Sequence, residues 1–486
     1  MYKLNQDKVP LLEGMKEYAD RDIAAFYVPG HKRGKGVGIL ADYFGEQLMR
    51  LDASSIPALD NVGNPTGIIK EAQDLFADAY GADVAFFMAN GSTSACHAML
   101  MAVLSPGDKI LMPKTIHKSA LNGLILCGGI PVYMTSEVCT KEGITKNVSA
   151  NEVRNQLNAN PDARAVFILN PTYFGYTSDL KQISQLCYER GVLLLTDEAH
   201  GAHFPFHQDM PISAMASGAD MSCISVHKTG GALTQASVLV VKTGRIDVNR
   251  VKKAVNIMQS TSTSYLLMGS LDGARYNLVK NGEKQLAKAV KLSKKAQHEL
   301  SKIAGVSVVN EEKFHDPTKL VINVSRLSLT GFQVYELLRC EYDIQPELCE
   351  TDHILAVISL GDCERWVLRL VQAMEEIAQK YPSHEHEVFS QPPFQDVVVS
   401  MSPRDAYYSD KELILFQDAI GRTAGESILA YPPGIPIISP GELITVEVIR
   451  ILRDLKAKNA FIVDNTDPEL EKILVVSSKS SAKSKT

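Results

Sequence analysis

Two stretches decide the fold, VLLLTDEAHGAHF at 192–204 and MSCISVHKTGG at 221–231. Each begins with a short, mostly apolar run and then changes to polar and small residues. Runs of this length between turn signals are typical of strands that are buried on both faces. The same pattern occurs upstream in DVAFFMANG (83–91) and ARAVFILNPTYFG (163–175), and helical stretches separate these segments. The alternation predicts βαβ units around a mostly parallel sheet, which is an α/β fold.

The surrounding elements follow the same plan. We expect helices over 69–82, 93–104, 117–128 and 179–191, and further strands over 109–113 and 130–134. The run SVLVVK (237–242) follows the strand at 221 after only a short Gly-rich turn, so it can pair antiparallel. Residues 1 to about 70 are rich in turn signals and are expected to be irregular.

The length of 486 residues predicts two to three domains. We expect an N-terminal arm, a large ligand-binding domain, a small α+β domain, a C-terminal domain and a disordered tail. Their ranges are 1–70, 71–305, 306–382, 395–476 and 477–486, with a linker near 383–394. A long, charged helical stretch at 267–305 would lead into the small domain.

Charge and cysteine content limit the possible functions. The 50 basic and 56 acidic residues give a net charge of −6, which argues against nucleic acid or an anionic membrane as a partner. No apolar run is long enough to span a bilayer, and the polar start lacks the core of a signal peptide. The 8 cysteines form no C-x-x-C pair, so we expect reduced thiols, no metal site and a cytoplasmic location.

Polar residues stand where the predicted strands end, and ligands bind at that edge of a parallel sheet. Asp197 ends one apolar run, and Lys228 follows another. Burial is unfavourable for an aspartate unless a positive group faces it, and burial makes a lysine a better nucleophile by lowering its pKa. Each residue alone also has a simpler explanation. Asp197 can be a helix cap or a hydrogen-bond acceptor in the core, and Lys228 can extend its amine to water.

A third group lies upstream, in the turn Gly91-Ser92-Thr93-Ser94 between a strand and a helix. Its hydroxyls, its backbone N–H groups and the helix dipole suit a phosphate monoester, although a simple helix cap needs only one hydroxyl. A phosphate turn, an acid for a protonated ring nitrogen and a nucleophilic lysine are the groups that hold pyridoxal 5′-phosphate. Together they predict an enzyme that uses this cofactor.

Several motifs occur in a fixed order over most of the chain. They are FYVPGHKRG (26–34), NPTYFG (170–175), DEAHGAHF (197–204), SVHKTGGALTQAS (225–237), TSTSYLLMGSLDGAR (261–275) and YPPGIPIISPGE (431–442). In these motifs the chain resembles fold-type-I pyridoxal-phosphate enzymes, and more narrowly the bacterial ornithine/lysine/arginine decarboxylase family. The resemblance implies an aspartate-aminotransferase-like three-layer sandwich with a small α+β domain and a C-terminal domain. It also implies the short form of the family, without an amino-terminal wing domain.

The resemblance further implies roles for individual residues. Lys228 would bond covalently to the cofactor, and Asp197 would pair with its ring nitrogen. His117 would stack on one ring face, and Ala199 would pack on the other. The phosphate would be held by Ser92, Thr93, Ser94, Ser225 and His227, with a hydroxyl from 260–264 of a second subunit. Lys228, His200 and His227 are the candidates for returning a proton to the substrate carbon.

The basic end of such a substrate needs acidic partners. Glu442 and Glu426 lie around the Pro-rich run, and Glu347, Glu350 and Asp352 lie in PELCETD (346–352). Glu442 is the best motif match. A solvated surface acid is the alternative for each of them.

The implied function is pyridoxal-phosphate-dependent decarboxylation of a basic L-amino acid in polyamine biosynthesis. The arginine-specific members, which form agmatine and CO2, are favoured over those that form cadaverine from lysine or putrescine from ornithine. An aminotransferase or lyase on the same fold is a rival, with Arg326 as its carboxylate clamp, and so is a non-catalytic regulatory relative. The family builds its site from two chains, so the resemblance implies a homodimer with shared active sites.

Overall fold

The computed structural model describes residues 2–139, 142–309, 313–382, 397–430, 434–458 and 460–478. The chain forms two compact units, each made of two segments. The first unit is Met1–Ala102 with Leu195–Leu286, and the second is Val103–Leu194 with Ala287–Thr486. The expected linker at 383–394 and the end of the expected tail, from 479 on, lie outside the described residues. The domain boundaries inferred from the sequence stay a prediction.

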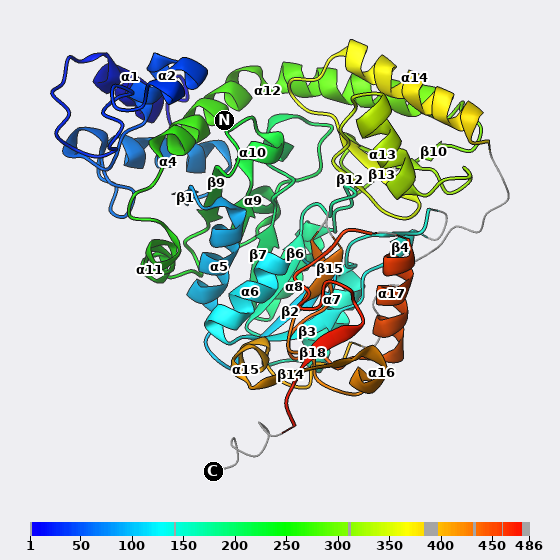
Figure 1. Ribbon diagram of the computed structural model, residues 1–486. Helices are drawn as coiled ribbons and strands as arrows, with labels where there is room; N and C mark the ends of the chain where they lie inside the picture. The colour runs from blue at the N-terminus through cyan, green and yellow to red at the C-terminus, as the bar shows by residue number, and fades with distance from the viewer. Residues whose placement is uncertain are drawn as a thin grey trace. The chain divides into compact units, whose positions relative to one another are not determined.

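Among the described residues, the largest sheet has seven strands in the order β1–β9–β8–β7–β6–β2–β3 (Figure 1). Their bounds are β1 Val84–Met88, β2 Lys109–Pro113, β3 Ile130–Met134, β6 Ala165–Leu169, β7 Leu193–Asp197, β8 Met221–Ile224 and β9 Ser237–Val241. Strand β2 pairs parallel with β3 and with β6, and β7 pairs parallel with β8. Strand β9 is antiparallel to both β8 and β1. The predicted α/β class and the antiparallel pairing of the run at 237 are confirmed.

Burial explains why these strands have so few polar residues. Every residue of β6, β7, β8 and β9 is buried, so charged side chains come only at the strand ends, and the polar residues inside the strands are the small Thr196 and Ser222. The helices that follow the chain through this region are α4 Ile68–Ala79, α5 Gly91–Val103, α6 Lys118–Cys127, α7 Ala150–Ala159, α8 Leu180–Glu189, α9 Ala214–Ser217, α10 Val226–Thr229, α11 Val248–Met258 and α12 Tyr265–Leu300. Helices α7 and α8 start where the side chains of Ser149 and Asp179 accept backbone N–H groups.

The N-terminal region corrects one expectation. Residues up to about 70 are not irregular, because they contain α1 Pro10–Asp20, α2 Gly38–Phe44 and α3 Glu46–Leu51. Helix α1 has a proline in its first turn, and Leu11, Met15 and Ala19 form a buried stripe at four-residue spacing. The turn-rich runs at 28–38 and 59–67 led to the prediction of irregular structure for the whole region, although the spacing of these three residues is helical.

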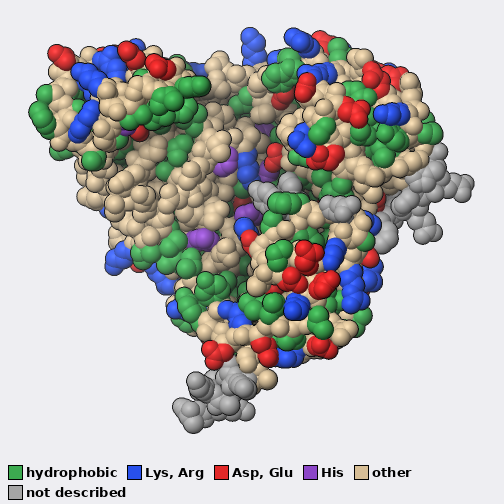
Figure 2. All heavy atoms as spheres, in the orientation of Figure 1, with side chains coloured by type: hydrophobic (Ala, Val, Ile, Leu, Met, Phe, Trp, Pro, Cys, Tyr) green, Lys and Arg blue, Asp and Glu red, His purple; other side chains and the backbone are tan. Residues whose placement is uncertain are grey.

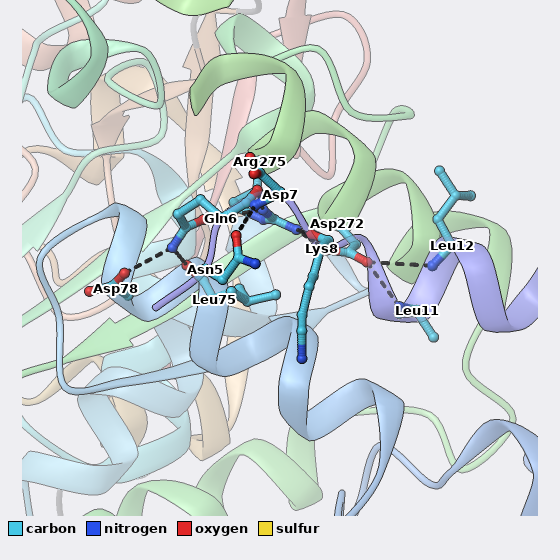
Figure 3. A network of polar contacts seen from close by, with 10 residues as sticks. All are labelled: Asn5, Gln6, Asp7, Lys8, Leu11, Leu12, Leu75, Asp78, Asp272 and Arg275. Atoms are coloured by element: carbon cyan, nitrogen blue, oxygen red, sulfur yellow. Dashed lines mark hydrogen bonds and ion pairs between the residues drawn. The ribbon is translucent and has the colours of Figure 1, made fainter. Parts of the chain in front are cut away.

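A buried ion pair attaches the start of the chain to α12 within the first unit (Figure 3). Arg275 is fully buried and donates to Asp272 Oδ1 at 2.7 Å, to the Gln6 carbonyl at 2.9 Å and to the Lys8 carbonyl at 2.6 Å. Asp272 Oδ2 in turn accepts the backbone N–H of Leu11 at 2.9 Å, in the first turn of α1. One guanidinium and one carboxylate thus satisfy backbone groups of a segment that is more than 260 residues away in sequence.

The second unit contains smaller sheets. Strands β10 Ser307–Val308, β11 Lys319–Asn323, β13 His353–Val357 and β12 Leu348–Cys349 pair antiparallel in that order. Strands β10, β11 and β13 share one apolar cluster with α13 Gly331–Glu341, α14 Glu364–Lys380 and the end of α12. Figure 1 shows these helices beside the sheet. A two-stranded ribbon, β4 Val138–Cys139 with β5 Ile144–Thr145, lies in the same unit.

The last part of the second unit has its own apolar cluster. The strands that contribute to it are β14 Lys411–Leu415, β18 Lys472–Val476, β16 Ile435–Ile438, β15 Ile428–Ala430 and β17 Ile462–Val463, and the helices are α16 Phe416–Ala419 and α17 Val446–Ala457. Helix α15 Pro403–Tyr408 belongs to the same part of the chain. Gly441 has φ +92°, and a Cβ there would lie 2.4 Å from the Met401 carbonyl oxygen, which explains the glycine of the PGE run. In the described part of the chain, no helix is both long and apolar enough to cross a membrane.

Candidate functional site

Asp197 and the segment of Lys228 lie at the ends of neighbouring parallel strands in the first unit. Asp197 is the last residue of β7 and pairs in register with Cys223 of β8. Lys228 lies four residues after the end of β8, in the short helix α10. Because both strands run in the same direction, the two functional groups appear at the same sheet edge, as the strand-end rule predicted.

The Asp197 carboxyl is only 7% exposed. Its Oδ1 accepts the backbone N–H of Ala199 at 3.0 Å. Burial raises the pKa of Asp197, and the positive charge of Lys228, the Ala199 N–H and the Cys223 thiol act in the opposite direction. A further cation or N–H group that faces this carboxyl would stabilise its charged form.

Lys228 contacts a histidine directly. Its Nζ lies 3.0 Å from Nε2 of His200, a side chain that is 5% exposed. An ammonium can donate to the imidazole, and a protonated imidazole can donate to a neutral amine, so one proton can pass between the two groups. The amine is a nucleophile only when it is neutral, and His200 is therefore placed to set the state of Lys228.

The predicted phosphate turn forms the start of α5. Gly91 has φ +76°, a conformation that suits glycine and turns the chain from β1 into the helix. Ser225 Oγ donates to Ser92 Oγ at 2.7 Å, which ties this turn to the end of β8. Ser94 Oγ donates to the Gly91 carbonyl at 2.9 Å, and Thr93 is exposed. The first N–H groups of a helix have no acceptor inside it, so they remain available to an anion.

His227 and the run at 260–264 also belong to the first unit. The Nδ1 of His227 lies 3.0 Å from the Ala236 carbonyl, which only accepts, so Nδ1 carries a proton and Nε2 is left as an acceptor in the neutral ring. Thr263 Oγ1 donates to the Ser260 carbonyl at 2.7 Å. The contact from 260–264 to a second subunit stays a prediction.

The other predicted site residues belong to the second unit, including the acids Glu347, Glu350 and Asp352 of the run at 346–352. His117 precedes α6, and its Nδ1 accepts the Ser119 N–H as a helix cap. Glu426 accepts the backbone N–H groups of Thr466 at 2.7 Å and Leu474 at 2.6 Å. The stacking role of His117 and the substrate role of Glu426 stay predictions. Arg326, the clamp of the aminotransferase alternative, follows β11 and is exposed.

Glu442, another predicted residue of the second unit, forms an ion pair that the sequence did not reveal. Lys114 Nζ lies 2.6 Å from both carboxylate oxygens of Glu442, and the Tyr133 hydroxyl donates to Oε1 at 2.6 Å. The side chains of Lys114 and Glu442 are 3% and 2% exposed. Lys114 directly follows β2, so the strand-end rule could have found it, but its partner is 328 residues away in sequence. The substrate role of Glu442 stays a prediction, and in this structure its carboxylate already has a cation.

The first unit therefore brings together most of the predicted cofactor residues: Ser92, Thr93, Ser94, Asp197, Ala199, His200, Ser225, His227 and Lys228. Their chemistry fits pyridoxal phosphate. The α5 turn offers hydroxyl and N–H donors for a phosphate, Asp197 is a buried acid that gains from a protonated ring nitrogen, and Lys228 is an amine for an aldehyde. Each of these groups is held by neighbours that do not depend on the cofactor.

Comparison with known proteins places this arrangement in a family. The model of the Orn/Lys/Arg decarboxylase major domain matches residues 9–313, and that of the C-terminal domain of the same family matches residues 383–464. The arginine decarboxylase of Halalkalibacterium halodurans is 40% identical over 92% of this chain and 94% of its own length. The arginine decarboxylase of Bacillus subtilis is 39% identical over 93% of this chain and 95% of its own length.

A solved structure supports the fold. The lysine decarboxylase LdcF of Francisella novicida superposes with a TM-score of 0.84 over 97% of this chain and 82% of that chain, at 20% sequence identity. Decarboxylases of this family use pyridoxal phosphate. The residues that the first unit brings together fit this cofactor. The chain belongs to the ornithine/lysine/arginine decarboxylase family.

Proposed function

We propose that this protein converts L-arginine to agmatine and CO2, with pyridoxal phosphate bound at Lys228 and Asp197. The observation that carries the proposal is the amine of Lys228, 3.0 Å from His200, beside the buried acid of the neighbouring strand end. The choice of arginine among basic amino acids is supported by the two relatives that are named arginine decarboxylases. Lysine and ornithine remain the alternative substrates.

The chain's own residues account for the chemical needs of the reaction. Pyridoxal phosphate, when bound, supplies an electron sink for the electrons that the departing carboxylate leaves behind. Asp197 places a negative charge at the end of β7, where it favours the protonated form of a ring nitrogen that faces it. The serine hydroxyls at the start of α5, joined to Ser225, hold an anion at a fixed position.

Proton transfer is assigned to the Lys228–His200 pair. His200 Nε2 can take a proton from Lys228 and so free the amine to react. The same proton, held on either nitrogen, can return to the substrate carbon once CO2 has left. His227 is the alternative donor, because its Nδ1 faces the Ala236 carbonyl and only Nε2 can take up a further proton.

The test is CO2 release and amine formation by the purified holoenzyme with L-arginine, L-lysine and L-ornithine in parallel. Agmatine is the expected product, and Lys228→Ala should abolish turnover. We expect His200→Asn to lower kcat by about 10²–10⁴-fold, and His227→Asn to lower it by less. Cofactor absorbance without CO2 from any of the three substrates would reject decarboxylation and favour transamination or a regulatory role.

We further propose a homodimer and a cytoplasmic location. All 8 cysteines are free thiols, which supports a reducing compartment. The N-terminal segment carries large exposed apolar side chains, among them Phe26 at 97% and Tyr43 at 83% exposure, with Phe44 and Ile39 nearby. Figure 2 shows hydrophobic side chains gathered over this segment, where α1 and α2 lie. Contiguous exposed apolar surface on a protein is typical of an interface, and a second copy is the partner proposed.

A further inference from the structure

The second unit contains a cavity that none of the predicted cofactor residues lines, and one of the acids of the run at 346–352 lies in it. Its volume open to the centres of water molecules is about 110 Å³. At about 10–15 Å³ for each water, this is room for roughly seven to eleven waters, and so for a ligand of the size of an amino acid or its amine. The lining comes from the β12 region, the loop after β6, the start of α13 and the C-terminal sheet.

One charged side chain lies in this lining. Glu350 directly follows β12, and among the described lining residues it is the only ionisable acid or base apart from a tyrosine and a cysteine. Within the described part of the chain its carboxylate meets neither a hydrogen-bond donor nor a cation, whereas its backbone N–H donates to the His353 carbonyl at 2.8 Å. The nearby charge of Asp352 has the same sign and makes the site more negative.

The rest of the lining is aromatic and aliphatic. Tyr173, Phe174, Phe332 and Phe461 contribute rings, and Phe461 is 67% exposed. Aromatic faces attract guanidinium and ammonium groups, and a carboxylate can accept two hydrogen bonds from one guanidinium. An anion would meet repulsion here, and an uncharged ligand would leave the carboxylate without a counter-charge.

We propose that this cavity binds a small organic cation, with its guanidinium or ammonium head on the Glu350 carboxylate and its hydrocarbon part among the aromatic rings. The ligand class is that of the substrate and product named above, and in this respect the inference rests on the proposed function. Binding itself requires no decarboxylation, so the two can fail separately. The cation has two possible sources, the amino-acid substrate and its amine product.

The test measures agmatine binding to the holoenzyme at pH 8 by calorimetry. Glu350→Gln removes the charge and keeps the shape. Asp343→Asn is the matched control, because Asp343 is an acid shortly before β12 whose side chain is 92% exposed. We expect Glu350→Gln to lower the affinity at least tenfold, or to remove one bound equivalent per chain, while Asp343→Asn binds as the wild type does. Phe461→Ala should weaken binding several-fold. Equal binding by wild type and Glu350→Gln, or an equal loss in Glu350→Gln and Asp343→Asn, overturns the proposal.

Steady-state kinetics then identify the source of the cation. A higher KM for arginine in Glu350→Gln, with kcat retained, would place the basic end of the substrate in the cavity. An unchanged KM with loss of agmatine inhibition would make the cavity a separate site for the product. Either result supports a cation site at Glu350, and unchanged KM together with unchanged inhibition contradicts it. Absence of CO2 release with agmatine binding intact would reject the proposed reaction alone.

Discussion

Glu350 gives a prediction about pH at the scale of one residue. Burial, and then the charge of Asp352, raise the pKa of Glu350 to about 7. The unfolded chain releases this proton near pH 4.5, so between about 4.5 and 7 the folded state holds more protons and loses stability as the pH rises. At 1.36 kcal/mol per pKa unit, the loss is at most about 3 kcal/mol.

Glu350→Gln should therefore raise the melting temperature at pH 8 and change it little at pH 5, where the wild-type carboxyl is protonated. Three titratable groups lie beside this side chain. Burial raises the pKa of Cys349 to about 12 and lowers the pKa of His353 to about 4, so both are neutral at pH 5 and at pH 8 in either protein. The repulsion between Asp352 and Glu350 is relieved by the change, and it is part of the gain expected at pH 8. Thermal unfolding without added amine, with Asp343→Asn alongside, checks this. The same shift at both pH values would show that Glu350 is not buried in its charged form.

The Lys114–Glu442 pair gives a second residue-scale prediction. Burial lowers the pKa of Lys114, and Glu442 opposes this shift. Removing one member of a buried pair leaves the other charge unmatched, which costs about 3–5 kcal/mol. We expect Lys114→Met to destabilise the protein by that amount, and the double variant Lys114→Met/Glu442→Gln to be destabilised by less than the sum of the two single changes.

Urea unfolding of the single and double variants measures this coupling. Lys118→Met is the control, because the Lys118–Asp464 pair, at 3.0 Å, is 33% and 41% exposed. An exposed pair contributes about 0–1 kcal/mol. Additive effects of Lys114→Met and Glu442→Gln would mean that the two charges do not depend on each other.

Residue types alone predicted the polar groups at the strand ends but not the contacts that depend on tertiary structure. Asp197 and Lys228 could be predicted because a polar residue after a buried strand is a local signal, and the parallel order of β7 and β8 brings both to one edge. The partner of Lys114 could not be predicted from the sequence, because a pairing across 328 residues depends on tertiary structure. The cavity at Glu350 could not be predicted either, because its lining residues lie far apart in the sequence, from Thr115 to Phe461.

At the scale of elements, Arg275 holds α1 and the preceding segment to α12. Burial raises the pKa of Asp272, and Arg275 opposes the shift. Without the guanidinium, Asp272 would be a buried unpaired acid, and the carbonyls of Gln6 and Lys8 would lose their donors. We expect Arg275→Met to speed hydrogen exchange in residues 5–20 at least tenfold, and to leave β7 and β8 unchanged.

Lys8→Met is the matched control for this change. It removes the exposed ion pair with Glu71 in the same segment and should leave exchange in α1 unaltered. Arg275→Lys should lie between the two, because an ammonium cannot reproduce the fork of donors. Wild-type exchange in the Arg275→Met variant would show that apolar contacts alone hold α1 in place.

Buried strands and the helices between them could be predicted, whereas the helices of the N-terminal region could not. The antiparallel β9 followed from its tight connection to the strand before it. Helix α1 was not predicted although Leu11, Met15 and Ala19 have helical spacing. The turn-rich sequence on its C-terminal side indicated irregular structure for the whole region. Helices α2 and α3 are 7 and 6 residues long and have no side-chain cap, so local sequence carries little signal for them.

At the scale of the whole molecule, the exposed apolar side chains of the N-terminal segment lead to the last prediction. Phe26 and Tyr43 are 97% and 83% exposed, and a monomer would leave both in water. If they lie in a dimer interface, Phe26→Asp and Tyr43→Asp would each bury a charge on association and oppose it strongly, because a buried unpaired charge is costly. We expect the double variant to shift from dimer to monomer in light scattering coupled to size-exclusion chromatography.

Activity gives this experiment its second readout. A site that is completed by a second subunit loses turnover when the dimer dissociates, and turnover should return with protein concentration as dimers re-form. Tyr188→Asp is the control, because this tyrosine is 68% exposed on α8, outside the N-terminal segment, and should leave mass and activity as they are. A wild type that is monomeric and fully active would exclude the shared site. A double variant that stays dimeric would place the interface on another surface, and the apolar side chains of residues 26–44 would then need a different partner.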